Sequence, residues 1–100
     1  MENINPEYIA EVRQLIGDWI REFRKDKGLT QEQVGEMLGI TEGTVCKIEA
    51  GKWLSLEMLI RLCVALDCFL FLVPKDSNDD LALVMRKRFE IMRAEGKLES

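Results

Sequence analysis

The sequence has no histidine, two prolines, one tyrosine, and three cysteines that do not form a C-x-x-C pair. Zinc sites and acid–base catalysis depend heavily on histidine or on paired cysteines, so these absences argue against a metal site, a cofactor and an enzyme. The three cysteines, Cys46, Cys63 and Cys68, are an odd number, which is typical of proteins in a reducing compartment. We therefore expect a cytoplasmic protein with no catalytic residues.

A long apolar run is also missing. The longest, CFLFLV at residues 68–73, is far shorter than the roughly 20 residues that a membrane-spanning helix needs. The first residues, MENINPEY, carry acids where a signal peptide carries bases. We expect no association with a membrane.

Positive charge is scarce, because 14 Lys and Arg stand against 18 Asp and Glu and leave a net charge of −4. An acidic chain is an unfavourable partner for a polyanion. The charge is unevenly distributed, however. Residues 19–53 hold six acids and six bases, and residues 81–100 hold five bases and three acids. A nucleic acid would meet net repulsion everywhere except in these two stretches.

The chain is rich in helical periodicity. From Asn5 to Lys27, apolar residues recur at spacings of three and four, which predicts an amphipathic helix with Asn5 as N-cap and Pro6 at its first position. The pair Gly17-Asp18 leaves two alternatives: a break with Asp18 as a fresh cap, or one long helix that tolerates a glycine. We favour the single helix.

Three shorter helices follow, each with its own start and stop signals. Thr30 and Gln33 form a capping-box pattern before a helix that ends at Gly39, with Val34, Met37 and Leu38 as its apolar positions. Thr41 caps a helix that ends at Gly51, and Ser55 caps a helix over Leu56–Leu66. Their inward-facing residues are expected to be Val45 and Ile48 in the former and Leu59, Leu62, Cys63 and Leu66 in the latter.

The carboxyl-terminal third changes character. A bulky run halted by Pro74 predicts a short strand made of Phe69, Leu70, Phe71, Leu72 and Val73. A lone strand is unstable in water, so a second copy of the chain would have to pair with it. A final amphipathic helix is expected over Asp80–Glu95. The alternative is that strand and helix only cover the domain's own core.

Residues 24–52, RKDKGLTQEQVGEMLGITEGTVCKIEAGK, place two short helices on either side of a tight turn at Gly39-Ile40. With small Gly35 and the following pattern LIRLCVAL, this segment resembles the Cro/C1-type (XRE family) helix-turn-helix transcriptional regulators over roughly residues 16–73. The resemblance implies an all-α, phage-repressor-like bundle of four to five helices, followed by the short strand and final helix. It also implies a DNA-binding domain at 1–73 and a helical extension at 74–100.

The resemblance also implies roles for single residues. Arg24 and Glu49 would form a structural ion pair, since a guanidinium meets a carboxylate through two hydrogen bonds. The Thr41–Gly51 helix would lie in the major groove of double-stranded DNA. Phosphates would be contacted by Gln31 and Lys52, and bases by Glu42, Gly43, Thr44 and Lys47.

Three positions depart from the family pattern. Relatives often carry Gln or Ser where this chain has Glu42 and Gly43, and Ala50 stands where an Asn often contacts phosphate. Glu42 can accept from a cytosine amino group but meets only repulsion at the wrong base. We therefore expect modest affinity per monomer, with discrimination supplied by Glu42.

Two functions are compatible with these residues. The leading hypothesis is a repressor that occupies an inverted-repeat operator as a homodimer. The alternative is an antitoxin-like module whose carboxyl-terminal segment binds a toxin or another protein. The basic cluster at Arg86–Arg93 is read first as a solvated helix face, and alternatively as a nucleic-acid contact or a docking helix. Cys46 leaves a redox switch open as a further alternative.

Overall fold

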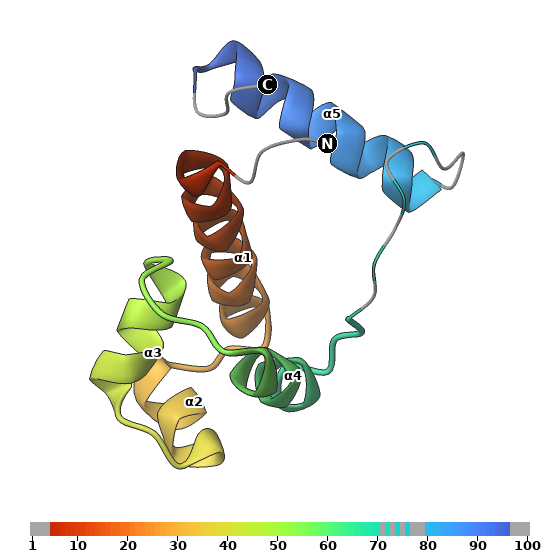
Figure 1. The fold of residues 1–100 in the computed structure, drawn as a ribbon. Helices are drawn as coiled ribbons and strands as arrows, with labels where there is room; N and C mark the ends of the chain where they lie inside the picture. The colour runs from red at the N-terminus through yellow and green to blue at the C-terminus, as the bar shows by residue number, and fades with distance from the viewer. Residues whose placement is uncertain (1–4, 71, 73, 75, 77–79, 97–100) are drawn as a thin grey trace. The chain divides into compact units, whose positions relative to one another are not determined.

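The computed structural model describes residues 5–70, 72, 74, 76 and 80–96. This part of the chain contains five helices: α1 (Pro6–Asp26), α2 (Gln31–Leu38), α3 (Glu42–Glu49), α4 (Leu56–Ala65) and α5 (Asp80–Ala94), shown in Figure 1. The all-α prediction is confirmed. No described helix is long and apolar enough to cross a membrane.

The strand predicted after α4 is not observed at the positions the structure describes. Phe69, Leu70 and Leu72 have no strand conformation, while Phe71 and Val73 lie outside the described residues. Phe69 is 96% exposed and Leu72 is 97% exposed. Strand pairing needs a neighbouring backbone, and none of the described residues pairs with this segment.

The helices begin where the sequence predicts. Thr30, Thr41 and Ser55 all take an extended backbone and accept a hydrogen bond from the backbone N–H three residues on, which satisfies one of the unpaired donors of the first turn. In return, the Gln33 side-chain oxygen accepts from the backbone N–H of Thr30, so the capping box is complete. At α1, the Asn5 side chain accepts from the backbone N–H of Glu7 at 2.8 Å.

The first four helices end in the same type of turn. In each, a residue with positive φ lets the next backbone N–H reach back five residues, a Schellman closure. The closures are Leu29 N to Arg24 O, Ile40 N to Gly35 O, Lys52 N to Lys47 O and Cys68 N to Cys63 O. Three of the turn residues are glycines and the fourth is Asp67, with φ 57°, the one non-glycine residue of positive φ among those described.

Residues Val12–Leu70 form one compact unit with a single apolar core. In this unit α2 and α3 lie side by side and α4 packs against α2, as Figure 1 shows. Val34, Val45, Ile48 and Leu62 are almost completely buried. Met37 was expected to face inward but is 53% exposed, and Met58, which was not singled out, is buried. The buried core consists of Ile20, Val34, Leu38, Val45, Ile48, Met58, Leu62 and Leu66.

α1 is one continuous helix through Gly17, as favoured from the sequence. A Cβ on Gly17 would lie 2.6 Å from the Glu49 carbonyl oxygen, so only glycine lets α1 approach the end of α3 this closely. Gly35 has the same role toward the turn after α2, because its Cβ would lie 2.7 Å from the Ile40 carbonyl oxygen. Gly17 therefore lets α1 lie against the end of α3, and Gly35 lets α2 lie against the turn before α3. Together these two contacts define the position of α3.

α5 belongs to a different unit from the helix-turn-helix. It runs from Asp80 to Ala94, one residue short of the expected end, and Gly96 follows with φ 76°. Its described apolar side chains Leu83, Val84 and Ile91 are all exposed.

Candidate nucleic-acid interface

α3 has one face in the core and one in solvent. Val45 and Ile48 are 0% and 1% exposed, because residues three apart share a face of a helix. On the other face Glu42, Gly43 and Lys47 are exposed, together with Cys46. This helix therefore presents a short polar surface whose only full charges are one carboxylate and one ammonium.

Thr44, the remaining base-contact candidate, is half-buried and already hydrogen-bonded. Its hydroxyl lies 2.8 Å from the Thr41 hydroxyl, which also accepts from the Thr44 backbone N–H at 3.1 Å. The sequence contained the signal, a threonine three residues after a threonine N-cap, but we did not predict this contact. The Thr44 hydroxyl is thereby oriented along the first turn of α3.

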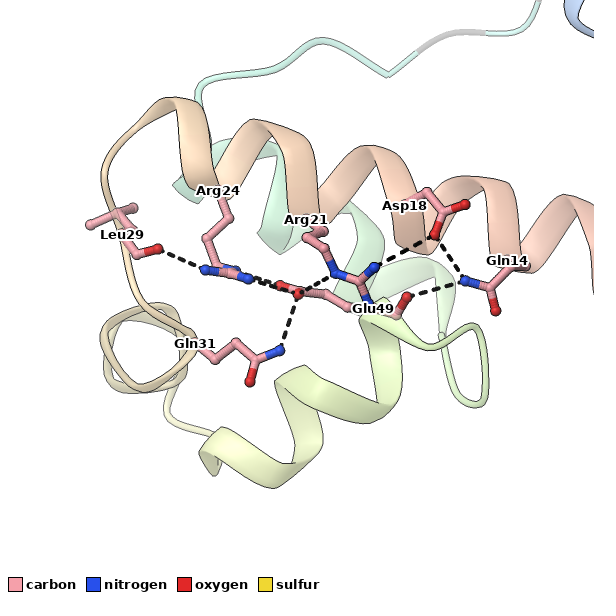
Figure 2. Close-up of polar contacts among 7 residues, drawn as sticks. All are labelled: Gln14, Asp18, Arg21, Arg24, Leu29, Gln31 and Glu49. Atoms are coloured by element: carbon pink, nitrogen blue, oxygen red, sulfur yellow. Dashed lines mark hydrogen bonds and ion pairs between the residues drawn. The ribbon is translucent and has the colours of Figure 1, made fainter.

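The structure brings Arg24 of α1 and Glu49 of α3 together beneath this surface (Figure 2). Arg24 donates from Nε to Glu49 Oε2 at 2.6 Å and from Nη2 to Glu49 Oε1 at 3.0 Å, the fork arrangement that favours arginine over lysine. Its third nitrogen, Nη1, donates to the Leu29 carbonyl oxygen at 2.9 Å. The Glu49 side chain is completely buried, so this pair connects α1, the turn before α2 and the end of α3.

Two further donors converge on Glu49. Gln31, at the first position of α2, donates from Nε2 to Glu49 Oε1 at 3.1 Å, and Arg21 Nε lies 3.4 Å from the same oxygen. Arg21 also lies 4.0 Å from Asp18. The sequence reasoning missed Arg21, although its spacing of three from Arg24 places both on one face of α1. It assigned Gln31 to a phosphate and did not foresee that its amide would be held by Glu49.

These contacts set the charge state of the pair. Burial by itself raises the pKa of Glu49, but hydrogen bonds from Arg24 and Gln31 and the charges of Arg24 and Arg21 outweigh it, so the pKa is lowered. The hydrogen bond to Glu49 raises the pKa of Arg24 further above its ordinary value. Both groups are therefore ionised at neutral pH.

The phosphate-contact candidates lie at two helix ends. Lys52 is exposed just beyond the turn that closes α3, and Gln31 opens α2, where the first backbone N–H groups have no partner within the helix. Arg61 of α4 does not join them, because it donates to the Leu38 carbonyl oxygen at 2.6 Å and so caps the end of α2. Among the described residues no group of His, Cys, Asp or Glu could hold a metal ion.

Comparisons with known proteins agree with this geometry. Residues 20–68 match the helix-turn-helix family. The chain is 44% identical over 48 residues to an uncharacterized HTH-type transcriptional regulator of Methanothermobacter thermautotrophicus, covering 47% of this chain and 70% of that protein. It is 34% identical over 74 residues to transcriptional regulator ClgR of Mycobacterium tuberculosis, covering 73% of this chain and 66% of that protein. It is 38% identical over 47 residues to the uncharacterized HTH-type transcriptional regulator YgzD of Bacillus subtilis, covering 46% of this chain and 71% of that protein. No solved structure matches the chain significantly.

Proposed function

Because the chain belongs to the Cro/C1-type (XRE) family of helix-turn-helix transcriptional regulators, we propose that it represses transcription by occupying an inverted-repeat operator as a homodimer. The observation that carries this proposal is the exposed face of α3, which is held against the body of the domain by the buried Arg24–Glu49 pair. A rigidly held, solvent-exposed helix suits insertion into the major groove. In this proposal residues 1–73 bind DNA and residues 74–100 form a helical extension.

Base recognition is assigned to the exposed residues of α3. Lys47 donates to guanine O6 or N7, and Thr44 contacts a base edge or a thymine methyl. Glu42 accepts from a cytosine amino group and repels other sequences, while Gly43 allows close approach without reading a base. Specificity then depends on the positive charge of Lys47, which attracts guanine, and on the negative charge of Glu42, which repels bases other than cytosine.

Phosphate binding is assigned to Lys52 and to the first turn of α2. Because the Gln31 amide already donates to Glu49, its backbone N–H and those after it are the groups proposed to meet the phosphate. Few basic contacts imply a shallow dependence of affinity on salt, with a slope of about −0.9 for each phosphate neutralised.

The test is selection of bound DNA from a random pool, followed by affinity measurements with variants. Lys47→Ala should cost about 1–3 kcal/mol on the selected site and relax specificity at one base pair. Lys25→Ala is the matched control, because Lys25 is an exposed lysine of α1 outside the α3 surface. Glu42→Gln should bind non-cognate sites more tightly. Failure to select any sequence at low salt would refute the proposal.

The dimer is supported by apolar side chains that one copy leaves uncovered. Leu56, Ile60 and Val64 recur every four residues along α4 and are 69%, 48% and 77% exposed, and Phe69 and Leu70 follow in the next segment. We propose that the segment Phe69–Val73 pairs with its counterpart in a second copy, and that α4 adds apolar contact. Half-sites would then lie about 34 Å apart on the DNA. Sedimentation that finds a monomer at tens of micromolar would contradict this part alone.

A second candidate function is favoured by α5, where Leu83, Val84 and Ile91 are exposed on a helix outside the helix-turn-helix unit. This is the composition of a helix that docks onto another protein, as an antitoxin-like module would require. Co-expression with the product of the neighbouring gene tests it. A complex that survives purification and is lost in Val84→Glu would support it, whereas independent elution of the two proteins would count against it.

A further inference from the structure

The end of α4 places two cysteines at the two ends of one hydrogen bond. The Cys68 backbone N–H donates to the Cys63 carbonyl oxygen at 2.7 Å across the left-handed residue Asp67. The path from one Cα atom to the other consists of this hydrogen bond and the Cα–C, C=O and N–Cα bonds. Their summed length sets an upper limit of about 7 Å on the distance between the two Cα atoms, and the bends between the bonds make the distance shorter. Disulfides form over Cα separations of about 4.4–6.8 Å.

The two positions are also ones whose side chains commonly meet. A Schellman closure is frequently accompanied by a contact between the third residue from the helix end and the residue that follows the left-handed one, and here these are Cys63 and Cys68. Both thiols are free and half-buried. Burial raises the pKa of the Cys63 thiol, and the proximity of Cys68 adds to the rise. Cys68 Sγ donates to the Leu66 carbonyl oxygen at 3.4 Å, which holds it over the last turn of α4.

We propose that Cys63 and Cys68 are a redox-active dithiol that a low-molecular-weight disulfide, such as oxidised glutathione, converts into an intramolecular disulfide. The Cys68 thiolate attacks one sulfur of the small disulfide and releases one thiolate, forming a mixed disulfide. The Cys63 thiolate then attacks Cys68 Sγ and releases the second. The two protons that the cysteines lose are taken up by the two small thiolates, so two electrons pass from the protein to the small disulfide.

We assign the first attack to Cys68 because burial makes the Cys63 thiolate harder to form; Cys63 loses its proton only in the second step, when it attacks the mixed disulfide beside it. The new bond would brace the turn at Asp67, where this chain lacks the glycine found after α1, α2 and α3. Because it closes a very short ring over a left-handed residue, the disulfide should be readily reduced, as regulatory disulfides are. The site is chemically independent of the α3 surface.

The experiment uses the full chain carrying Cys46→Ser, which removes the exposed third thiol and leaves the core untouched. The protein is incubated with oxidised glutathione at about 0.1 mM, alkylated, and analysed by intact mass. The second thiol of a neighbouring pair acts at an effective concentration in the millimolar range, which is about tenfold or more above that of the small thiol in solution. The internal disulfide is therefore favoured over the mixed disulfide by about the same factor. The expected product is a monomer that has lost both thiols and carries no glutathione.

Cys63→Ser and Cys68→Ser in the same background are the controls, and each should stop at a mixed disulfide or an unmodified thiol. Reduction of the oxidised protein with dithiothreitol should restore both thiols, with the helical circular dichroism unchanged throughout. Stable glutathione adducts on the two-cysteine protein, or disulfide-linked dimers, would overturn the proposal. If a serine variant is unfolded, the corresponding alanine variant replaces it, and the intact two-cysteine protein still decides the outcome.

Discussion

Replacing Glu49 by glutamine removes the charge on which four donor groups converge. The Glu49 side chain is completely buried and accepts from Arg24 Nε at 2.6 Å, Arg24 Nη2 at 3.0 Å and Gln31 Nε2 at 3.1 Å, with Arg21 Nε at 3.4 Å. Glutamine keeps the shape of the side chain but has one acceptor oxygen, and its amide nitrogen would face the same donors. Arg24, which is only 9% exposed, would then lack its buried counter-charge.

Breaking a buried ion pair from one side typically costs about 3–5 kcal/mol. Arg24 keeps its bond to the Leu29 carbonyl oxygen, so we expect Glu49→Gln to lower the free energy of unfolding by about 3 kcal/mol, near the lower end of that range. For a domain of this size each kcal/mol lowers Tm by about 4–8 °C, so Tm should fall by about 12 °C or more.

The assay is urea unfolding, followed by far-ultraviolet circular dichroism and tryptophan fluorescence. Lys27→Gln is the control, because Lys27 and Asp67 form a pair at 3.7 Å whose side chains are 47% and 91% exposed. Exposed pairs contribute at most about 1 kcal/mol. The combined substitution Arg24→Met with Glu49→Leu should be less destabilising than Glu49→Gln, since it leaves neither charge buried alone. A loss below about 1 kcal/mol in Glu49→Gln would refute the reasoning.

Further outcomes follow from the same geometry. The pKa of Glu49 is lowered on folding, so the stability that its carboxylate contributes is present above the unfolded pKa of about 4.3 and is lost as the pH falls through the folded pKa. The wild type should therefore lose more stability than Glu49→Gln between about pH 5 and pH 3. Free energies of unfolding in urea that fall equally for both proteins over this range would contradict the prediction. Gly35→Ala should cost about 1–3 kcal/mol, since its Cβ would lie 2.7 Å from the Ile40 carbonyl oxygen. Gly43→Ala is its counterpart and should be neutral or stabilising by up to about 1 kcal/mol, because the nearest atom is 3.8 Å away; thermal melts that rank the two variants the other way would show the packing argument wrong. Asp67→Gly should stabilise by about 1 kcal/mol by relieving a φ of 57°, and an unchanged or lower Tm would contradict that.

Local features of the fold were predictable because their causes lie within a few residues. Thr30, Thr41 and Ser55 cap their helices by bonding a backbone N–H three positions away, so the side chain and its partner are both readable in sequence. The same holds for the glycine turns after α1, α2 and α3, where positive φ is a property of the residue itself.

Other features depended on partners distant in sequence. Met37 has the spacing of a core residue but is exposed, because α2 turns Val34, Gly35 and Leu38 toward its neighbours instead. The strand prediction for Phe69–Val73 depended on a pairing partner that the described part of one chain does not provide, and Phe69, Leu70 and Leu72 are not in a strand. Local composition does not specify either outcome.

The sequence alone was sufficient to identify the helix-turn-helix and to place Glu42, Gly43 and Lys47 on the exposed side of α3, because a period of 3.6 residues divides buried from exposed positions. It did not show that Thr44 is half-buried. Only the tertiary structure decided that Gln31 and Arg21 join Arg24 on one carboxylate, and that Gly17 must be glycine to admit the end of α3. Those contacts join residues as distant in sequence as Gly17 and Glu49, and their distances follow from how helices pack against each other. Packing geometry is a property of the assembled core, which no single segment encodes.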